Sequence, residues 1–206
     1  MLIGAGRPRR VVVMGASMGG IEALGQVLPR LTGAPSVVVV LHLASQRPSL
    51  VPDLLAAHCA LPVKEAEDKE PLAPGTIYFA PPDHHLLIER TLCLALSGDG
   101  PVHHSRPSID VLFESAAEAL GPRLAAVLLT GANADGAAGL AVIAATGGTV
   151  VVQDPGTARA AEMPRAGLAL CPGAHVLPLD AIAPFLNRLA SSTGAGPSPQ
   201  LPEDLP

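Results

Sequence analysis

Aromatic residues and lysines are scarce in this sequence. Its 206 residues include no tryptophan, one tyrosine and three phenylalanines, so the stacking surfaces with which proteins hold single-stranded nucleic acids or sugars are lacking. Lys64 and Lys69 are the only lysines, and the formal net charge is −5, which leaves no broad basic face for a phosphate backbone. We therefore expect no nucleic-acid partner.

Cysteines and long apolar runs are also few. Cys59, Cys93 and Cys171 are far apart and form no C-x-x-C pair, which argues against a disulfide framework or a zinc knuckle. The most apolar region, 124–152, is broken by polar residues and several glycines, so it does not read as a membrane span. The arginines near the start lead into a short apolar run without a cleavage-type site. We expect a cytoplasmic protein with no membrane insertion.

Small aliphatic residues are abundant, and they are arranged as strands that alternate with helices. Each apolar run is followed by a stretch with helical periodicity, and several of the runs are apolar on both faces. Such runs are typical of parallel strands covered by helices on both sides. The sequence predicts a doubly wound α/β fold with a mainly parallel sheet. The runs are 10–15, 36–42, 123–131, 149–154 and 175–179.

Two segments depart from this alternation. Short strand candidates crowd together at 76–81, 85–89 and 92–97, and they predict a small antiparallel hairpin inserted at the sheet edge. The end of the chain, 191–206, has the proline, glycine and serine content of a disordered tail. We therefore predict one catalytic domain over residues 1–190, followed by this tail.

Three chemically complementary side chains follow three of the predicted strands. Ser17 comes after the first run, His42 closes the second, and Asp135 lies in the loop after the third. Because the carboxyl ends of parallel strands meet at one edge of a sheet, we expect these side chains to be neighbours. Their roles would be those of a Ser-His-Asp triad. Each also has a plainer explanation, as part of a tight turn, a hydrogen-bonded strand end or a helix cap.

The pentapeptide around Ser17 fits the motif G-x-S-x-G on a strand, a turn and a helix. Its small residues permit a sharp turn, and a helix beginning near Gly19 would point amide groups toward the serine, where they could stabilise an oxyanion. The turn is a poor match for dinucleotide binding. Ser17 replaces the middle glycine of G-x-G-x-x-G, and no acidic residue occurs between Glu22 and Asp53, where the ribose ligand belongs.

The remaining histidines and an arginine can be considered as metal ligands or substrate contacts. His84-His85 and His103-His104 are adjacent pairs, and adjacent residues of an extended segment point to opposite faces, so such pairs rarely chelate one ion. Ser108 is predicted to cap a helix that begins near Asp110. Arg106, separated from that helix by the rigid turn at Pro107, is a candidate substrate clamp.

Six segments in order resemble the catalytic domain of CheB, the chemotaxis protein-glutamate methylesterase. The resemblance runs from about residue 10 to about residue 189. It implies hydrolysis of glutamate γ-methyl esters on the cytoplasmic helices of chemoreceptors, and often deamidation of receptor glutamines, with no metal or organic cofactor. A receptor methyltransferase is a candidate second partner. The segments are MGASMGGIEAL, VVLHLAS, IYFAPPDHHLL, RPSIDVLFESAA, LLTGANADGAAGL and VVQDPGTARAAEMPRAGLA.

Carried over by position, the family triad falls on Ser17, His42 and Asp135. The resemblance also implies that the backbone amides of Met18 and Ala132 are the oxyanion donors. The family commonly has threonine at the first of these two positions and methionine at the second. It often has a proline-containing segment after the histidine, where this chain reads Leu-Ala-Ser.

Regulation and substrate leave alternatives open. CheB commonly carries an N-terminal receiver domain, whereas nine residues precede Arg10 here, so we expect either a stand-alone methylesterase or a chain separated from its regulatory half. The same fold could serve as a non-catalytic docking module for receptors or a methyltransferase. It could also act as an esterase on another methylated protein.

Overall fold

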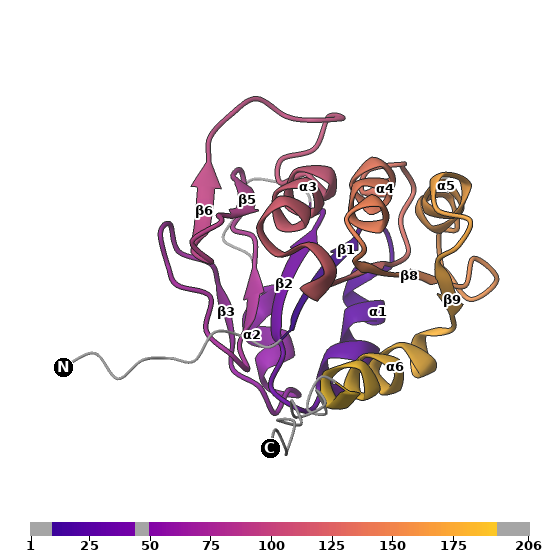
Figure 1. Ribbon diagram of the computed structural model, residues 1–206, viewed down its shortest axis with the longest axis horizontal. Helices are drawn as coiled ribbons and strands as arrows, with labels where there is room; N and C mark the ends of the chain where they lie inside the picture. Colours follow the sequence, from indigo (N-terminus) through magenta and orange to yellow (C-terminus); the bar gives the residue numbers. More distant parts are fainter. Residues whose placement is uncertain (1–9, 44–49, 193–206) are drawn as a thin grey trace, which may run out of the picture.

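The computed structural model describes residues 10–43 and 50–192, and these residues form a seven-stranded parallel sheet with helices on both faces (Figure 1). The strand order is β3-β4-β2-β1-β7-β8-β9. The doubly wound α/β fold is thus confirmed. The strands are β1 (Val11–Ala16), β2 (Ser36–Leu41), β3 (Val63–Glu65), β4 (Ile77–Phe79), β7 (Leu124–Leu128), β8 (Thr149–Gln153) and β9 (His175–Leu177).

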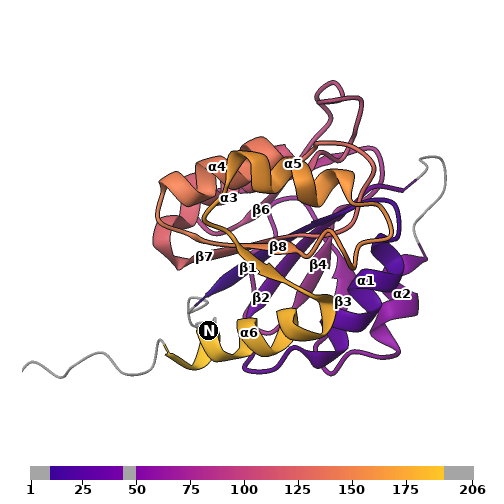
Figure 2. The ribbon, with the colours of Figure 1, turned by 90° about the vertical axis from the view of Figure 1, so that its right-hand side faces the viewer.

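Three α-helices cover each face of the sheet within the described residues (Figure 2). One face carries α1 (Gly20–Val27), α2 (Val51–Ala56) and α6 (Leu179–Ser192), and the other carries α3 (Ile109–Leu120), α4 (Ala137–Ala145) and α5 (Glu162–Leu170). None of the described helices is long and apolar enough to cross a membrane. Short 3₁₀ turns lie at Leu28–Arg30 and Gly121–Arg123. Apart from Ser191 and Ser192, which end α6, the predicted tail lies outside the described residues.

The valine-rich strands are explained by the two cores that the sheet separates. In β1, Val11 and Val13 pack into the core under α3, α4 and α5, whereas Val12 and Met14 pack into the core under α1 and α6. All four side chains are buried. Full burial of each contributes roughly 1.5–3 kcal/mol, so both faces of the strand favour the same apolar residues.

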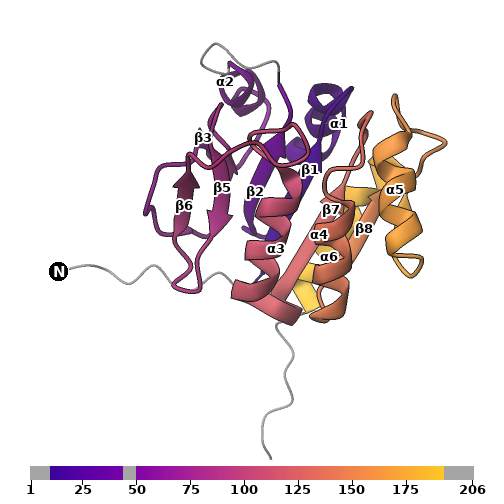
Figure 3. The same ribbon diagram turned by 90° about the horizontal axis from the view of Figure 1, so that it is seen from above.

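The middle of the chain differs in part from the prediction. The run 76–81 forms β4, which pairs in parallel with β2 on one side and β3 on the other, so it belongs to the main sheet. The other two candidates form β5 (His85–Ile88) and β6 (Leu94–Ser97), which pair antiparallel in a separate two-stranded sheet beside α3 (Figure 3). β3 was not predicted, because its three residues are only half-buried and show no clear apolar pattern.

The order of the strands shows that the winding direction reverses at the centre of the sheet. The connection from β1 through α1 leads to β2 on one side, whereas β7, on the other side of β1, is followed by α4 on the opposite face. Ligands of open α/β sheets bind where the winding reverses in this way, outside the carboxyl ends of the strands. Here those ends belong to β2, β1 and β7.

Candidate active site

Ser17 and His42 leave two neighbouring strands at the same level. The last residues of β1 and β2, Ala16 and Leu41, are paired in register, and the His42 amide donates to the Ala16 carbonyl at 3.0 Å. On the other side, the Ser17 amide donates to the Thr130 carbonyl at 2.9 Å. The Ser17 hydroxyl makes no hydrogen bond to any described residue. Catalytic hydrogen bonds are often absent or long before substrate binds.

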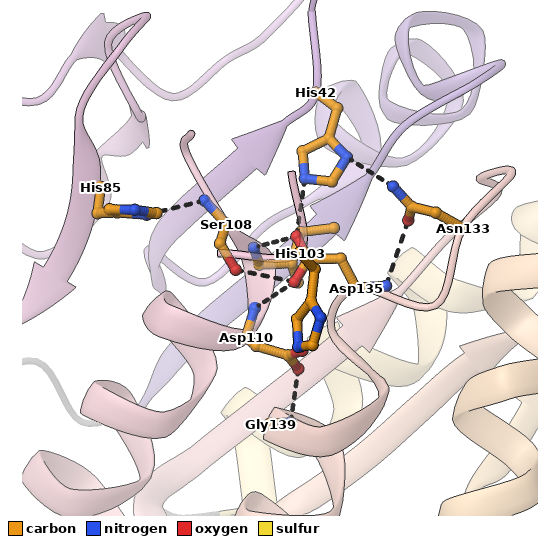
Figure 4. Close-up of polar contacts among 9 residues, drawn as sticks. His42, His85, His103, Ser108, Asp110, Asn133, Asp135 and Gly139 are labelled. Atoms are coloured by element: carbon orange, nitrogen blue, oxygen red, sulfur yellow. Dashed lines mark hydrogen bonds and ion pairs between the residues drawn. The ribbon is translucent and has the colours of Figure 1, made fainter. Parts of the chain in front are cut away.

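The structure brings His42 and Asp135 into direct contact (Figure 4). His42 Nε2 lies 2.8 Å from Asp135 Oδ2, and the side chains are 12% and 0% exposed. The other ring nitrogen, Nδ1, lies 3.5 Å from the Asn133 side-chain amide, which is a long contact. If Nε2 carries the proton shared with the carboxylate, Nδ1 has the lone pair that can accept a proton. The ring is therefore reversed relative to the usual Ser-His-Asp arrangement, in which Nδ1 faces the carboxylate.

Asp135 is held by the N-terminus of α3. Its carboxylate accepts hydrogen bonds from the Ser108 hydroxyl at 2.8 Å, the Ile109 amide at 2.7 Å and the Asp110 amide at 3.0 Å, in addition to the His42 ring. Burial opposes ionisation, but these four donors more than offset it, so the pKa of Asp135 lies below its ordinary value. The positive end of the helix dipole acts in the same direction. Asp135 is thus an anion at neutral pH.

Ser108 stands at the predicted helix start, but it does not cap its own helix. It occupies the N-cap position of α3, yet its side chain makes no capping bond and donates instead to Asp135. The Asp135 carboxylate, which comes from the loop before α4, accepts the first amides of α3 in place of the Ser108 side chain. The plainer expectation that Asp135 caps the helix following it does not describe these contacts either, because its partners lie on α3. A charged acceptor binds helix amides more strongly than a hydroxyl does.

A buried histidine supports this helix start from behind. His85 Nδ1 accepts the Ser108 amide at 3.1 Å, and its Nε2 lies 3.1 Å from the Gly100 carbonyl. These partners fit a neutral ring with its proton on Nε2. The adjacent His84 is exposed, so the two side chains of the pair do point to different environments. No group of three or more metal-ligating side chains occurs in the described part of the chain.

Two backbone amides near Ser17 are left without partners. Among the described residues, neither the Met18 nor the Ala132 N–H group makes a hydrogen bond. The Thr130 hydroxyl donates to the Met18 carbonyl at 2.8 Å and so ties the turn after β1 to the loop after β7. Gly19 has a φ of 80°, in the left-handed region that glycine adopts without strain. The Gly20 amide, at the start of α1, donates to the Ser17 carbonyl at 2.8 Å.

Gly15 of the pentapeptide has a second, unpredicted role. A Cβ atom at this position would lie 2.4 Å from Cγ2 of Ile109, the first residue of α3. The missing side chain therefore lets the N-terminus of α3 lie directly against β1. The same helix end donates to Asp135, so this close approach helps bring the carboxylate to the strand that precedes Ser17.

Arg106 lies beside His42, but its guanidinium is already engaged. Arg106 and His42 line the same small cavity of about 120 Å³. The guanidinium forms an ion pair with Asp83 and donates to the carbonyls of Gly98 and Asp99, so it closes the loop 98–106 on itself. These contacts give Arg106 a structural role. Its role as a substrate clamp stays a prediction.

Sequence reasoning missed the supporting residues of the site. Asn133 contacts His42, His85 contacts Ser108 and Asp110 contacts Asp135, but none of the three carries a recognisable motif. The one available signal was the crowding of polar residues in the segments 103–110 and 130–136. Pairing these two segments required the fold.

The chain is similar to known proteins over most of its length. A family model described as CheB methylesterase matches residues 12–186. A relative from Leptospira interrogans is 44% identical over 181 residues, which are 86% of this chain and 93% of that protein. Proteins of Anaeromyxobacter dehalogenans and Pseudomonas aeruginosa, both named protein-glutamate methylesterase/protein-glutamine glutaminase, are 42% and 37% identical. The matches cover 87% and 91% of this chain, but only 51% and 55% of those proteins.

A solved structure matches equally broadly. The crystal structure of the Thermotoga maritima CheB methylesterase catalytic domain superposes with a TM-score of 0.83 at 32% identity, covering 87% of this chain and 98% of that one. At this identity the likeness concerns more than the fold. The family match and the curated relatives agree with it, and the chain belongs to the CheB methylesterase family.

Proposed function

We propose that this protein is a cytoplasmic serine hydrolase that removes γ-methyl esters from glutamates on the cytoplasmic helices of chemoreceptors. The products would be glutamate and methanol. The same site would deamidate receptor glutamines and release ammonia. The proposal is supported by membership of the methylesterase family, by the names of the relatives and by the arrangement around His42.

In the acylation step, Ser17 Oγ attacks the ester carbonyl while His42 Nδ1 takes the hydroxyl proton. The C–O bond to the methoxy group then breaks, and the imidazolium returns the proton to the departing methoxide. Asp135 stabilises the imidazolium through Nε2. Such a general base contributes about 10²–10⁴-fold to the rate.

The Met18 and Ala132 amides would receive the oxyanion of the tetrahedral intermediate. Both N–H groups lack partners among the described residues, so they are available without breaking an existing bond. One oxyanion donor contributes about 10²–10³-fold in kcat. In the deacylation step, water attacks the acyl-enzyme, His42 takes its proton, and the proton passes to Ser17 as its bond to the acyl group breaks.

The contact between His42 Nε2 and Asp135 is the observation that carries the proposal. Asp135 already has four donors, so the ring is fixed with Nδ1 as the nitrogen available to a nucleophile. The Asn133 contact to Nδ1 is long enough for a closer hydroxyl to replace it. Ser17, which follows the neighbouring strand, would supply that hydroxyl.

The test is methanol release from a methylated chemoreceptor fragment. Ser17→Ala should lower the rate by about 10³-fold or more, because the proposed acyl-enzyme forms on the Ser17 hydroxyl. Ser97→Ala, which removes a serine hydroxyl on β6, is the matched control and should leave the rate unchanged. Methanol release that survives Ser17→Ala would overturn the mechanism. Turnover of unrelated esters at equal rates, or receptor binding without any turnover, would overturn the substrate assignment.

A further inference from the structure

We propose that Asp110 is a positioning residue for the reaction, because it ties the helix that follows Asp135 to the helix that holds Asp135. This inference rests on the proposed function, since it concerns how the triad carboxylate is kept against His42. Asp110 itself contacts no reacting atom. It would act through the first turns of α3 and α4.

The two helices cap each other reciprocally (Figure 4). Asp135, which lies just before α4, accepts the amides of Ile109 and Asp110 in the first turn of α3. In return, Asp110 Oδ1 accepts the Gly139 amide in the first turn of α4, at 2.7 Å. Each helix thus satisfies free N–H groups of the other with a carboxylate. The loop before α4 is fixed at Asp135 and again four residues later.

The two helices are also in close contact at this point. A Cβ atom on Gly139 would lie 2.5 Å from the Phe113 Cβ atom and 3.2 Å from the Asp110 carbonyl oxygen, so only glycine fits there. At such a distance the first turn of α4 has little freedom to move without α3. Asp135 lies only four residues before Gly139, so a shift of α4 caused by loss of the Asp110 bond would also move Asp135. Misplacement of a catalytic group by about 1 Å can cost about 10²-fold in rate.

Asp110 occupies an environment in which a carboxylate is unfavourable. The residue is only 4% exposed, the Asp135 carboxylate is its neighbour, and among the described residues the cationic candidate beside it is the exposed His103 at 3.8 Å. Burial raises the pKa of Asp110 to about 6, and the negative charge of Asp135 adds to the rise, although the Gly139 amide opposes it. An acid kept in this place is consistent with a requirement for a side-chain oxygen that accepts the Gly139 amide.

The first test compares variants that remove the acceptor with one that keeps it. Asp110→Ala and Asp110→Leu both abolish the bond to Gly139, and the cavity of about 470 Å³ beside Asp110 leaves room for a leucine. Asp110→Asn retains an oxygen for Gly139. Glu114→Gln is the control, because Glu114 is an exposed carboxylate one turn along the same helix with no hydrogen bond among the described residues.

We expect Asp110→Ala and Asp110→Leu to lower kcat about 10–100-fold, with KM within about threefold of the wild-type value. Asp110→Asn should stay within about threefold of wild type in kcat, and Glu114→Gln should be unchanged. The test needs only one of these two acceptor-free variants to be folded, as judged by circular dichroism. Wild-type kcat in that variant, or an equal loss in Asp110→Asn, would overturn the proposal.

The second test needs no substrate. Proton NMR at low temperature should resolve the proton between His42 Nε2 and Asp135 as a downfield resonance, identified by its loss in His42→Gln. This resonance should weaken or move in Asp110→Leu and persist in Asp110→Asn. An unchanged resonance in Asp110→Leu would overturn the positioning role. If the wild-type enzyme releases no methanol from any methylated receptor fragment, the proposed function fails, and this resonance alone decides the role of Asp110.

Discussion

The site has a buried end around Asp135 and an open end around Ser17. The two ends differ in how many of their hydrogen-bond donors and acceptors are paired within the protein. Around Asp135 the catalytic candidates are paired: the carboxylate accepts four hydrogen bonds, one of them from the His42 ring, and His85 supports the helix start from behind. Around Ser17 the hydroxyl and the amides of Met18 and Ala132 have no partner in the described chain. The buried end is complete without substrate, whereas the open end offers groups that only a substrate would satisfy.

This difference indicates that the buried end fixes the positions of its side chains, whereas the open end keeps groups free to bind substrate. Buried donors and acceptors that are fully paired hold their positions, because leaving any of them unpaired costs about 1–3 kcal/mol. Exposed unpaired amides cost little, since water can reach them. Changes at the buried end should therefore disturb both structure and rate, and changes to exposed side chains at the open end should disturb neither strongly.

The largest effect is expected from Asp135→Asn at the buried end. The amide cannot accept from both the α3 amides and the His42 ring without presenting its own N–H groups to some of them. We expect kcat to fall about 10³–10⁴-fold, as for loss of a triad carboxylate elsewhere. Methanol release measures the effect. Asp53→Asn, an exposed change of the same charge, is the control, and a loss of less than tenfold would contradict the assigned role of Asp135.

A smaller effect is expected from Gly15→Ala. Gly15 lies on the strand that precedes Ser17 and against the N-terminus of α3, which holds Asp135. The added methyl group would lie 2.4 Å from Ile109 and push the N-terminus of α3 away from β1. We expect about a 10²-fold loss of kcat and a destabilisation of about 1–3 kcal/mol. Gly98→Ala is the control, because nothing lies within 4 Å of its added Cβ. Partial recovery in Gly15→Ala combined with Ile109→Ala would identify the clash, and no recovery would argue against it.

Stability should depend on pH through Asp110. The pKa of Asp110 is raised to about 6 in the folded protein, so its favourable, protonated state is lost as the pH rises through that value. Asp110→Asn cannot ionise. Its stability advantage over wild type should grow between about pH 4 and pH 6 and stay constant above, reaching on the order of 2 kcal/mol. Urea denaturation at several pH values measures it.

Because wild type and Asp110→Asn are compared at each pH, the contributions of most other titratable groups to the stability difference cancel. Asp135, His103 and Glu114 are the charged or titratable groups that face Asp110, and all three are present in both proteins. A stability difference that does not change with pH would show that the Asp110 carboxyl does not titrate in this range.

The smallest effect is expected from Met18→Ala at the open end. The side chain is 56% exposed, and only the backbone N–H group is assigned a role. We expect kcat to stay within about threefold of wild type. The family commonly has threonine at this position, so Met18→Thr is a natural companion variant. A large loss of kcat in Met18→Ala would mean that the side chain, rather than the amide, organises this end.

Much of the architecture was predictable because its signals are local. Alternating apolar runs and helical stretches predicted the parallel sheet, and this fold, the family and the enzyme class are confirmed. Ser17 and His42 were found because each directly follows a strand, and Asp135 because it lies in the loop after the next strand of the alternation. Their catalytic roles stay predictions, although His42 and Asp135 are in contact.

What was not predictable depends on contacts between distant segments. The Ser108 pattern correctly located the start of α3, but no local rule links it to a carboxylate 27 residues later. The role of Gly15 depends on Ile109, which only the packing of α3 on β1 reveals. β4 was assigned to the hairpin because its true neighbours, β2 and the short β3, are separated from it in sequence.

Because β1 lies at the centre of the sheet, the Ser17 region should be among the last parts of the protein to open on heating or in denaturant. Main-chain bonds hold the Ser17 region from both sides, from His42 to Ala16 and from Ser17 to Thr130. The Ser17 amide should therefore exchange with solvent only in rare openings of the whole sheet, whereas the amides of loop 98–106 exchange in frequent local ones. A partly unfolded molecule would still carry Ser17 at the end of an intact strand, with the surrounding loops already open.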